Sequence, residues 1–313
     1  MSSSLSIFIK RLEFSLGERE AEHIEKNDVR QVRVAAIHGQ TNPFMKFFER
    51  LTVYQDLTPR SAAINMAIDE ALLETAKIPS IRFYRWNSPA LSFGYFGKFA
   101  DVADYATERD LVRRWTGGGV VFHGDDLTYS IVIPTSDPIF VESSMSTYGK
   151  IHRALRNALI ANGEAAELAT IARVADAGTS VNDSENSSRT DRDYNSSSCS
   201  HAPVARPTAQ WPPCHDGPQG RGYSRHLCFA NPVSADVMID SRKIAGAAQR
   251  RTRAGLLHQG SIQHVDLGNG LAERFASELS ASCVGRKLDD DILNRAHEIA
   301  ARKYGSNHWL KLR

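Results

Sequence analysis

The chain lacks the long apolar segments that cross a membrane. None of its uninterrupted apolar runs approaches the roughly 20 residues that a bilayer-spanning helix requires. The first ten residues contain only a short apolar stretch, and no small-residue cleavage pattern of a signal peptide follows it. We therefore expect a cytoplasmic protein without a membrane partner.

Cysteine is sparse, and the net charge is close to neutral. The 313 residues include four cysteines, at positions 199, 214, 228 and 283, too few and too irregular for a disulfide scaffold. A formal charge of +2 gives no support for a nucleic-acid partner. Hydrophobic residues make up 42% of the chain, which is enough to build a core for one large or two modest domains.

One segment lacks patterned apolar residues. Residues 174–225 are rich in Ser, Asn, Asp, Pro, Gly and Arg, and such a segment cannot bury enough surface to offset the entropy lost on ordering. We interpret it as a disordered insertion. Its cysteines and histidines lack the Cys-x-x-Cys spacing of a zinc knuckle, so no metal site is predicted. Residues 1–48, which include a strand pattern at 32–37, form an N-terminal extension of unknown role.

The rest of the chain, residues 49–313, is patterned as an α+β domain interrupted once by the insertion. Helical patterns begin after a capping residue or end at Asn-Gly, and alternating runs bounded by turn residues indicate strands. Helices are predicted at 61–75, 101–109, 148–161, 271–280 and 289–304. Strands are predicted at 51–54, 81–86, 90–93, 120–123, 127–133, 236–240, 243–247 and 258–264, and residues 111–114 lead into the three glycines at 117–119.

Three consecutive glycines are the most informative local feature. Residues 113–123 read Arg-Arg-Trp-Thr-Gly-Gly-Gly-Val-Val-Phe-His, and we call residues 114–119 the glycine loop. Glycines contribute no packing and cost entropy, so three together indicate a backbone that approaches a ligand closely. A tight turn between two strands with a structural histidine explains the run equally well. The spacing is neither that of a P-loop nor that of a dinucleotide-binding fingerprint.

A second candidate site combines Cys228 and Lys243 with the small residues Gly246, Ala247 and Ala248. A lysine close to a thiol favours the thiolate, lowers the cysteine pKa from about 8.5 and creates a nucleophile near neutral pH. The spacing alone does not show that the two side chains are close. A solvated strand lysine and a small buried cysteine are the alternative interpretation.

Four motifs, taken together and in order, resemble the biotin/lipoate ligase-like catalytic domain, which includes lipoate-protein ligases and LipM-type octanoyltransferases. They are residues 65–72, residues 82–96, the glycine loop with His123, and residues 242–250 leading to 258–262. The resemblance spans residues 51–262. It implies the fold of class II synthetases and biotin ligases, in which helices flank a mixed, largely antiparallel sheet.

Three features favour the transferase branch of this superfamily. Residues 126–130, Asp-Leu-Thr-Tyr-Ser, are similar to the Glu-Leu-Thr-Tyr-Ser run of octanoyltransferases, and Cys228 matches the position of their nucleophile. The chain also ends about fifty residues after His264, which we expect to leave no room for the accessory domain of many ligases. Gly119 points the other way, because ligases have glycine there and this transferase subgroup often has arginine.

The resemblance implies transfer of an octanoyl group from octanoyl-acyl carrier protein, through a thioester on Cys228, to a lysine of a lipoyl domain. The acceptor is a glycine cleavage H protein or a dehydrogenase E2 subunit. Cys228 and Lys243 are the implied catalytic residues, and no cofactor is required. The implied substrate-binding residues are Arg114, Thr116, Gly117, Gly118, Gly119, His123, Gly246, Ala247 and Ala248.

Two alternatives stay open at this point. An ATP-dependent lipoate-protein ligase would use ATP and Mg²⁺, with Lys243 and the glycine loop binding the phosphate of the acyl adenylate. A non-catalytic module that binds acylated proteins would need neither Cys228 nor Lys243 for chemistry.

Overall fold

The computed structural model describes residues 46–170, 228–268 and 270–312. The N-terminal extension up to residue 45, including a strand pattern at 32–37, and the whole insertion predicted at 174–225 lie outside the described residues. Within the described part of the chain, no helix has the length and apolar character needed to cross a bilayer.

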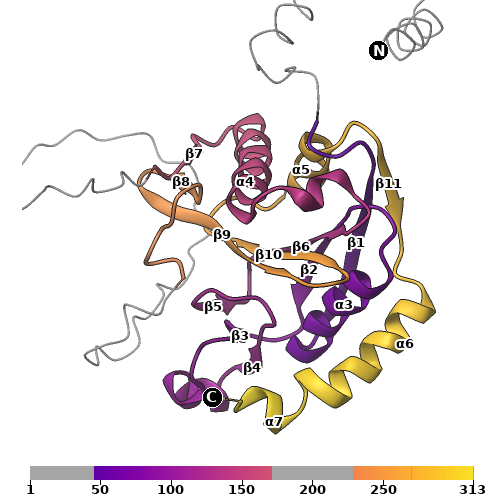
Figure 1. The fold of residues 1–313 in the computed structure, drawn as a ribbon. Coiled ribbons are helices and arrows are strands. Elements are labelled where there is room, and N and C mark those ends of the chain that lie inside the picture. The colour runs from indigo at the N-terminus through magenta and orange to yellow at the C-terminus, as the bar shows by residue number, and fades with distance from the viewer. Residues whose placement is uncertain (1–45, 171–227, 269, 313) are drawn as a thin grey trace, which may run out of the picture.

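An eight-stranded sheet forms the centre of the molecule, in the order β11-β1-β2-β6-β10-β9-β8-β7 (Figure 1). The strands from β2 to β7 along this order pair antiparallel, whereas β1 pairs parallel with both β2 and β11. The strands are β1 (Leu51–Arg60), β2 (Ser80–Trp86), β6 (Leu127–Pro134), β7 (Glu167–Leu168), β8 (Val237–Ile239), β9 (Arg242–Arg251), β10 (Gly255–Ile262) and β11 (Cys283–Arg286). The predicted mixed, largely antiparallel sheet is confirmed.

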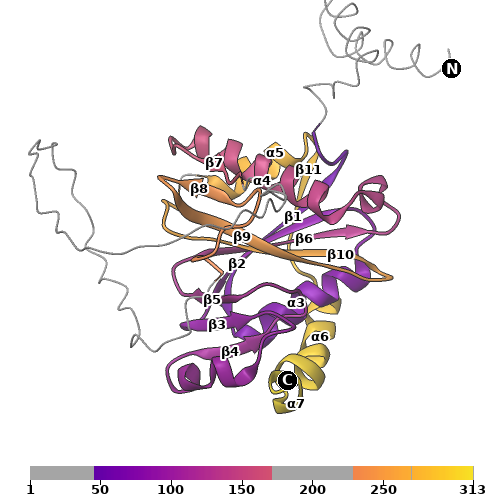
Figure 2. The ribbon, with the colours of Figure 1, turned by 60° about the vertical axis from the view of Figure 1, so that its left-hand side comes forward.

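Helices cover both faces of this sheet. Figure 2 shows α4 (Ser144–Ala161) and α5 (Leu271–Leu279) on one face, and α3 (Ala62–Thr75) and α6 (Asp290–Ile299) on the other. Helix α6 continues into a π-helical turn, η5 (Ala300–Tyr304), which leads to α7 (Asn307–Leu310). The central strands β6 and β10 are buried along their whole length because both of their faces pack against helical layers.

A smaller three-stranded sheet lies on the α3 side of the large one (Figure 2). Its strands are β4 (Asp110–Arg113), β3 (Ala90–Phe93) and β5 (Val120–His123), in the order β4-β3-β5. The glycine loop joins β4 to β5 and therefore faces the large sheet. The polar segment predicted as a helix at 101–109 consists of two 3₁₀ turns, η1 (Phe99–Asp101) and η2 (Ala103–Thr107).

The structure departs from the sequence prediction mainly at element ends. Helix α4 starts at Ser144 because Ser143 Oγ accepts the backbone N–H of Ser146 and caps it; a 3₁₀ turn, η3 (Pro138–Val141), precedes it. Strand β11 has no alternating pattern, since all four residues are exposed, and only its long-range pairing with β1 defines it.

Candidate functional site

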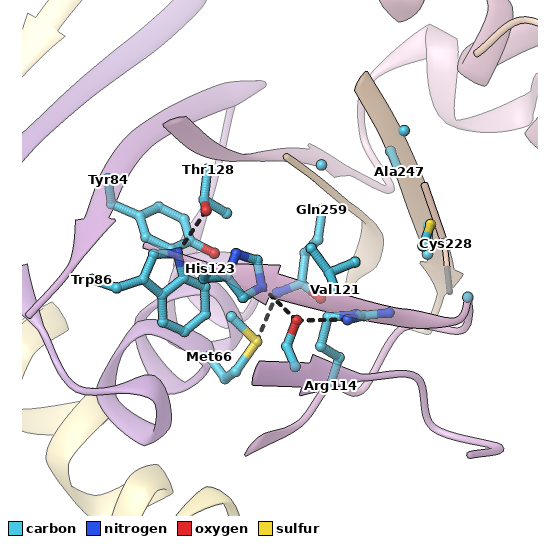
Figure 3. A pocket seen from close by; sticks show the side chains of 15 residues that line it. Met66, Tyr84, Trp86, Arg114, Val121, His123, Thr128, Cys228, Ala247 and Gln259 are labelled. Atoms are coloured by element: carbon cyan, nitrogen blue, oxygen red, sulfur yellow. Dashed lines mark hydrogen bonds between the residues drawn. The ribbon is translucent and has the colours of Figure 1, made fainter. Parts of the chain in front are cut away.

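A pocket lies between the small sheet and strands β9 and β10 of the large sheet (Figure 3). The space inside it, with the open solvent at its mouth, is about 380 Å³, of which about 30 Å³ can hold the centre of a water molecule. The sequence-predicted residues on its wall are Arg114, Gly118, His123, Cys228, Gly246, Ala247 and Ala248. The remaining wall residues are Met66, Tyr84, Trp86, Ser92, Val121, Thr128, Gln259 and Gly260.

Cys228 and Lys243 meet at one end of this pocket. The Lys243 ammonium donates to the backbone carbonyl of Cys228 at 2.8 Å and lies 3.7 Å from Cys228 Sγ. Its third partner is the fully buried Asp236 carboxylate, at 2.7 Å. Lys243 is itself buried, so the carboxylate compensates a charge that is costly to remove from water. We call Cys228, Lys243 and Asp236 the nucleophile end.

Gly246 makes room for the lysine side chain. A Cβ atom added at Gly246 would lie 2.4 Å from Lys243 Cε and 2.6 Å from Lys243 Nζ, closer than carbon atoms approach. A side chain at position 246 would therefore displace the Lys243 ammonium from Asp236 and Cys228. Ala247 and Ala248 continue the pocket wall beyond it.

Cys228 is also tied to the glycine side of the pocket. Its backbone N–H donates to the carbonyl of Val120, the first residue after the glycine loop, at 3.0 Å. Burial lowers the pKa of Arg114, and the charge of an ionised Cys228 opposes that shift. The thiol is thus within electrostatic range of two cations, Lys243 and Arg114.

The side chain of Arg114 stabilises the glycine loop by binding its backbone carbonyls. The guanidinium donates to the carbonyls of Gly117 at 3.1 Å and Gly119 at 2.7 Å. Gly118 adopts φ +85°, which disfavours any side chain, and a Cβ there would meet Arg114 and Ala248 at 3.3 and 3.4 Å. No acceptor within the described ranges pairs with the backbone N–H of any of the three glycines. These N–H groups are available to a ligand oxygen.

The other predicted residues support the loop without lining the pocket. Thr116 is fully buried and donates from Oγ1 to Gln259 Oε1 of β10 at 2.8 Å. Gly117 and Gly119 contribute the carbonyls that Arg114 binds. The sequence prediction grouped these three with the wall residues, whereas the structure separates the two sets.

His123, on the pocket wall, belongs to a buried polar network. Its Nδ1 lies 2.8 Å from Asp126 Oδ2, and its Nε2 lies 2.6 Å from Ser92 Oγ, which also accepts from Arg114 at 2.6 Å. Burial opposes ionisation of Asp126, but His123, Ser261 and the Gly124 N–H outweigh it and lower the pKa of the carboxyl. The order Ser-His-Asp is that of hydrolase triads, yet here Arg114 binds the serine oxygen and links the network to the glycine loop.

The opposite end of the pocket is formed by Met66, Tyr84 and Trp86, which gather away from Cys228 (Figure 3). We call these residues the apolar end. Tyr84 Oη donates to the buried Asp69 at 3.1 Å, and Trp86 Nε1 donates to Thr128 Oγ1 at 2.8 Å. Burial, reinforced by Asp69, raises the pKa of Tyr84 well above its usual value, so its hydroxyl stays a donor.

Comparison with known proteins identifies the family of the chain. Residues 61–266 match the model of the lipoyl protein ligase A/B catalytic domain. The matched range includes the glycine loop, Cys228 and Lys243. The chain belongs to this family. The class II synthetase type of fold implied by the sequence resemblance is shared by solved lipoate ligases of the family.

Two curated relatives and two solved structures illustrate the family. Octanoyltransferase LipM of Oceanobacillus iheyensis is 33% identical over 213 residues, which cover 66% of this chain and 61% of the relative. LipM of Clostridioides difficile is 31% identical over 258 residues, 74% of this chain and 79% of the relative. The chain thus spans less than two thirds of the length of the first of these relatives.

The structural likeness concerns the fold. Lipoate-protein ligase A bound with ATP superposes with a TM-score of 0.55 at 18% identity, covering 84% of this chain and 98% of that one. A bipartite lipoate protein ligase from Thermoplasma acidophilum gives a TM-score of 0.53 at 18% identity, covering 85% and 98%.

Several site residues of this lipoyl protein ligase A/B domain have no clear sequence signal. Asp236 stands seven residues before Lys243 in a turn-rich stretch, where an acidic residue is ordinary. Tyr84 and Trp86 lie inside a family motif, but nothing in their strand pattern shows that they face a pocket. Among the described residues, no group of three or more His, Cys, Asp or Glu side chains is placed to hold a metal ion.

Proposed function

We propose that this protein is an octanoyltransferase that moves an octanoyl group from octanoyl-acyl carrier protein to a lysine of a lipoyl domain. The observation that carries the proposal is Cys228 Sγ at the pocket wall, 3.7 Å from the Lys243 ammonium. Relatives that carry the name octanoyltransferase LipM support it.

In the first step the Cys228 thiolate attacks the thioester carbonyl of the donor. The new bond joins Cys228 Sγ to the acyl carbon, the bond from that carbon to the carrier sulfur breaks, and the carrier thiolate takes up a proton from the Lys243 ammonium. Lys243 supports this step because an adjacent ammonium stabilises the thiolate, which is the nucleophilic form.

Both steps pass through a tetrahedral oxyanion. The N–H of Gly118, which pairs with no acceptor among the described residues, and the Lys243 ammonium are the available donors for it. A well-placed donor of this kind contributes about 3 kcal/mol to the transition state. Arg114 fixes the loop so that these donors are preorganised.

In the second step the amine of the acceptor lysine attacks the acyl-enzyme. A carbon–nitrogen bond forms, the thioester bond to Cys228 breaks, and the thiolate is regenerated beside Lys243. The amine loses one proton, which the Lys243 side chain, left neutral by the first step, takes up to become an ammonium again. No cofactor enters either step.

The apolar walls of the pocket supply the affinity for the acyl chain. Met66, Val121 and Ala247 line it together with the aromatic rings of Tyr84 and Trp86. Burial of an aliphatic chain is worth about 0.8 kcal/mol per methylene, so seven or eight carbons account for most of the binding energy.

The ligase alternative rests on Gly119 and on the fold shared with a lipoate-protein ligase solved with ATP. In it, the glycine loop and Lys243 bind the acyl-adenylate phosphate, and ATP and Mg²⁺ are required.

One assay separates the alternatives. An apo-lipoyl domain, taken from a glycine cleavage H protein or a dehydrogenase E2, is incubated with octanoyl-acyl carrier protein without ATP, and in parallel with free octanoate, ATP and Mg²⁺. We expect acylation in the first mixture only. Acylation only in the second would replace the transferase with the ligase, and binding without turnover in either would indicate a non-catalytic module.

A further inference from the structure

Two histidines and a tyrosine lie buried between α4 and the sheet, and the proposed chemistry does not use them. Tyr129 Oη of β6 is 3.2 Å from His152 Nε2 of α4 and 3.3 Å from His258 Nε2 of β10. All three residues are fully buried. Because a buried polar group without a partner is costly, the direction of each bond can be worked out.

The donor and the acceptor of each hydrogen bond in this series are set by the groups at its two ends. The carbonyl of Ala235 only accepts, so His152 Nδ1 donates to it at 2.7 Å and Nε2 accepts from Tyr129. At the other end the Gln249 amide donates to His258 Nδ1 at 3.0 Å, which leaves His258 Nε2 to donate to Tyr129 Oη. If the Gln249 amide were reversed, the Nε2 atoms of both histidines would be acceptors, and the single hydroxyl proton of Tyr129 could satisfy only one of them.

In each of these hydrogen bonds the donor therefore lies on the Gln249 side and the acceptor on the Ala235 side. Both histidines are neutral in this arrangement. Burial lowers the pKa of His152 to about 4 and holds that of His258 well below its usual value, with the same result.

This series of hydrogen bonds ends at the Ala235 carbonyl, in the turn that carries Asp236. Ala235 has φ +68°, a left-handed conformation that costs free energy for a residue with a side chain. Asp236 then accepts from the Val233 N–H at 2.6 Å, from Tyr148 Oη and from Lys243 Nζ. Tyr148 and His152 are one helical turn apart on α4, so one face of this helix holds both the turn and the carboxylate.

We propose that His152, with Tyr148, is a positioning residue for Lys243: its Nδ1–H holds the Ala235 carbonyl so that the Asp236 carboxylate aims the ammonium at Cys228. This role rests on the proposed function only in that Lys243 serves the Cys228 thiol. The hydroxyl of Tyr148 also accepts the N–H of Ala247 at 3.2 Å, which fixes the adjacent pocket wall.

The test compares His152→Asn, which keeps an N–H near the Nδ1 position, with His152→Leu, which removes it. We expect His152→Leu to slow single-turnover acylation of Cys228 roughly 100-fold, the cost of misplacing a catalytic group by about 1 Å, with KM for the donor within about twofold. His152→Asn should restore most of the rate. His297→Leu, at an exposed histidine of α6, is the matched control and should change nothing.

A second variant and a second readout guard against misfolding. Tyr148→Phe removes one hydroxyl and keeps the ring, and we expect roughly a tenfold loss of the acylation rate. Iodoacetamide alkylation of Cys228 reports on Lys243 without any acyl donor, and the exposed Cys283 of β11 serves as an internal reference in the same chain. We expect the ratio of the two alkylation rates to change in His152→Leu and not in His152→Asn.

Wild-type acylation and alkylation rates in His152→Leu and Tyr148→Phe would overturn the proposal. Equal losses in His152→Asn and His152→Leu would also overturn it, because the Nδ1 donor would then be irrelevant. If the wild-type protein transfers no octanoyl group, the proposed function fails, whereas the alkylation ratio still decides the positioning role.

Discussion

The nucleophile end and the apolar end of the pocket are held in place by different means. At the nucleophile end, Cys228, Asp236 and Lys243 come from different segments, and an ion pair with few hydrogen bonds joins them. At the apolar end, rings from β2 are fixed through their polar tips, which bond to Asp69 and Thr128. The first arrangement keeps a charge beside a thiol, and the second keeps a wall rigid.

The polar layers behind the two ends also differ. Neutral histidines support the Asp236 turn, whereas behind the apolar end an ionised carboxyl, Asp126, accepts from Thr128, the partner of Trp86. We therefore expect the two ends to respond differently to the loss of a charge, to acid and to a change of side-chain volume.

Replacement of Lys243 by methionine should have the largest effect, because it removes the cation of the nucleophile end and keeps the volume. We expect the rate of octanoyl transfer to fall roughly 1000-fold, the combined loss of thiolate and oxyanion stabilisation. Steady-state rates measure this, with Lys150→Met as the control, since Lys150 pairs with Glu142 away from the pocket. A loss of tenfold or less would remove Lys243 from the mechanism.

Mild acid should loosen the nucleophile end before the apolar end. The pKa of His152 is lowered to about 4 by burial, against about 6.5 in the unfolded chain, so between these values only the unfolded state binds the proton. The free energy of unfolding should therefore fall as the pH drops from 6.5 to 4, by on the order of 3 kcal/mol from His152. The lowered pKa of Asp126 acts only below about pH 4.

Urea unfolding at pH 7.5 and pH 5 measures this effect. His152→Asn should be less destabilised by acid than the wild-type protein, and an identical pH dependence in both would contradict the buried neutral histidine.

Gly118→Ala tests the glycine side of the pocket. The new methyl group would occupy a left-handed conformation, which costs about 1 to 2 kcal/mol, and would press on Arg114. We expect roughly a 10- to 100-fold slower transfer as the loop donors move. Gly124→Ala is the matched control, because nothing lies within 4 Å of its added Cβ and its φ is ordinary. Equal activity of the two variants would show that the loop geometry is unimportant.

Met66→Ala should have the smallest effect and changes selectivity. Methionine is the flexible member of the apolar end, so shortening it makes room for about two further methylenes. We expect kcat/KM for decanoyl relative to octanoyl donors to rise about tenfold, from about 0.8 kcal/mol per methylene. Ile64→Ala, on the same helix but outside the pocket, should leave the ratio unchanged. An unchanged ratio in Met66→Ala would place the chain terminus elsewhere.

Much of the fold follows from local sequence patterns. Helix α3, strands β2 and β3 and helix α6 appear close to where periodicity and capping residues predict them. Strand β11 does not, because its exposed residues have no pattern and only pairing with β1 defines it.

The site likewise has parts that the sequence predicts and parts that only the structure reveals. The family motifs predict which segments form it, and the structure brings Cys228 and Lys243 together. The Asp236 turn is held by Tyr148 and His152 of α4, which lie far from it in the chain, and spacing does not encode such contacts. Neighbouring glycines also differ, since Gly118 lines the pocket while Gly117 and Gly119 bind Arg114, and sequence alone does not distinguish them.

The intact mass of the protein after incubation with octanoyl-acyl carrier protein tests the central claim most directly. Wild-type protein should gain one octanoyl group that hydroxylamine removes, and Cys228→Ser should gain no hydroxylamine-labile group, while Cys283→Ser behaves as wild type. Octanoyl transfer at an undiminished rate by a Cys228→Ser protein, or by a wild-type protein that never carries the adduct, would contradict a thioester on Cys228.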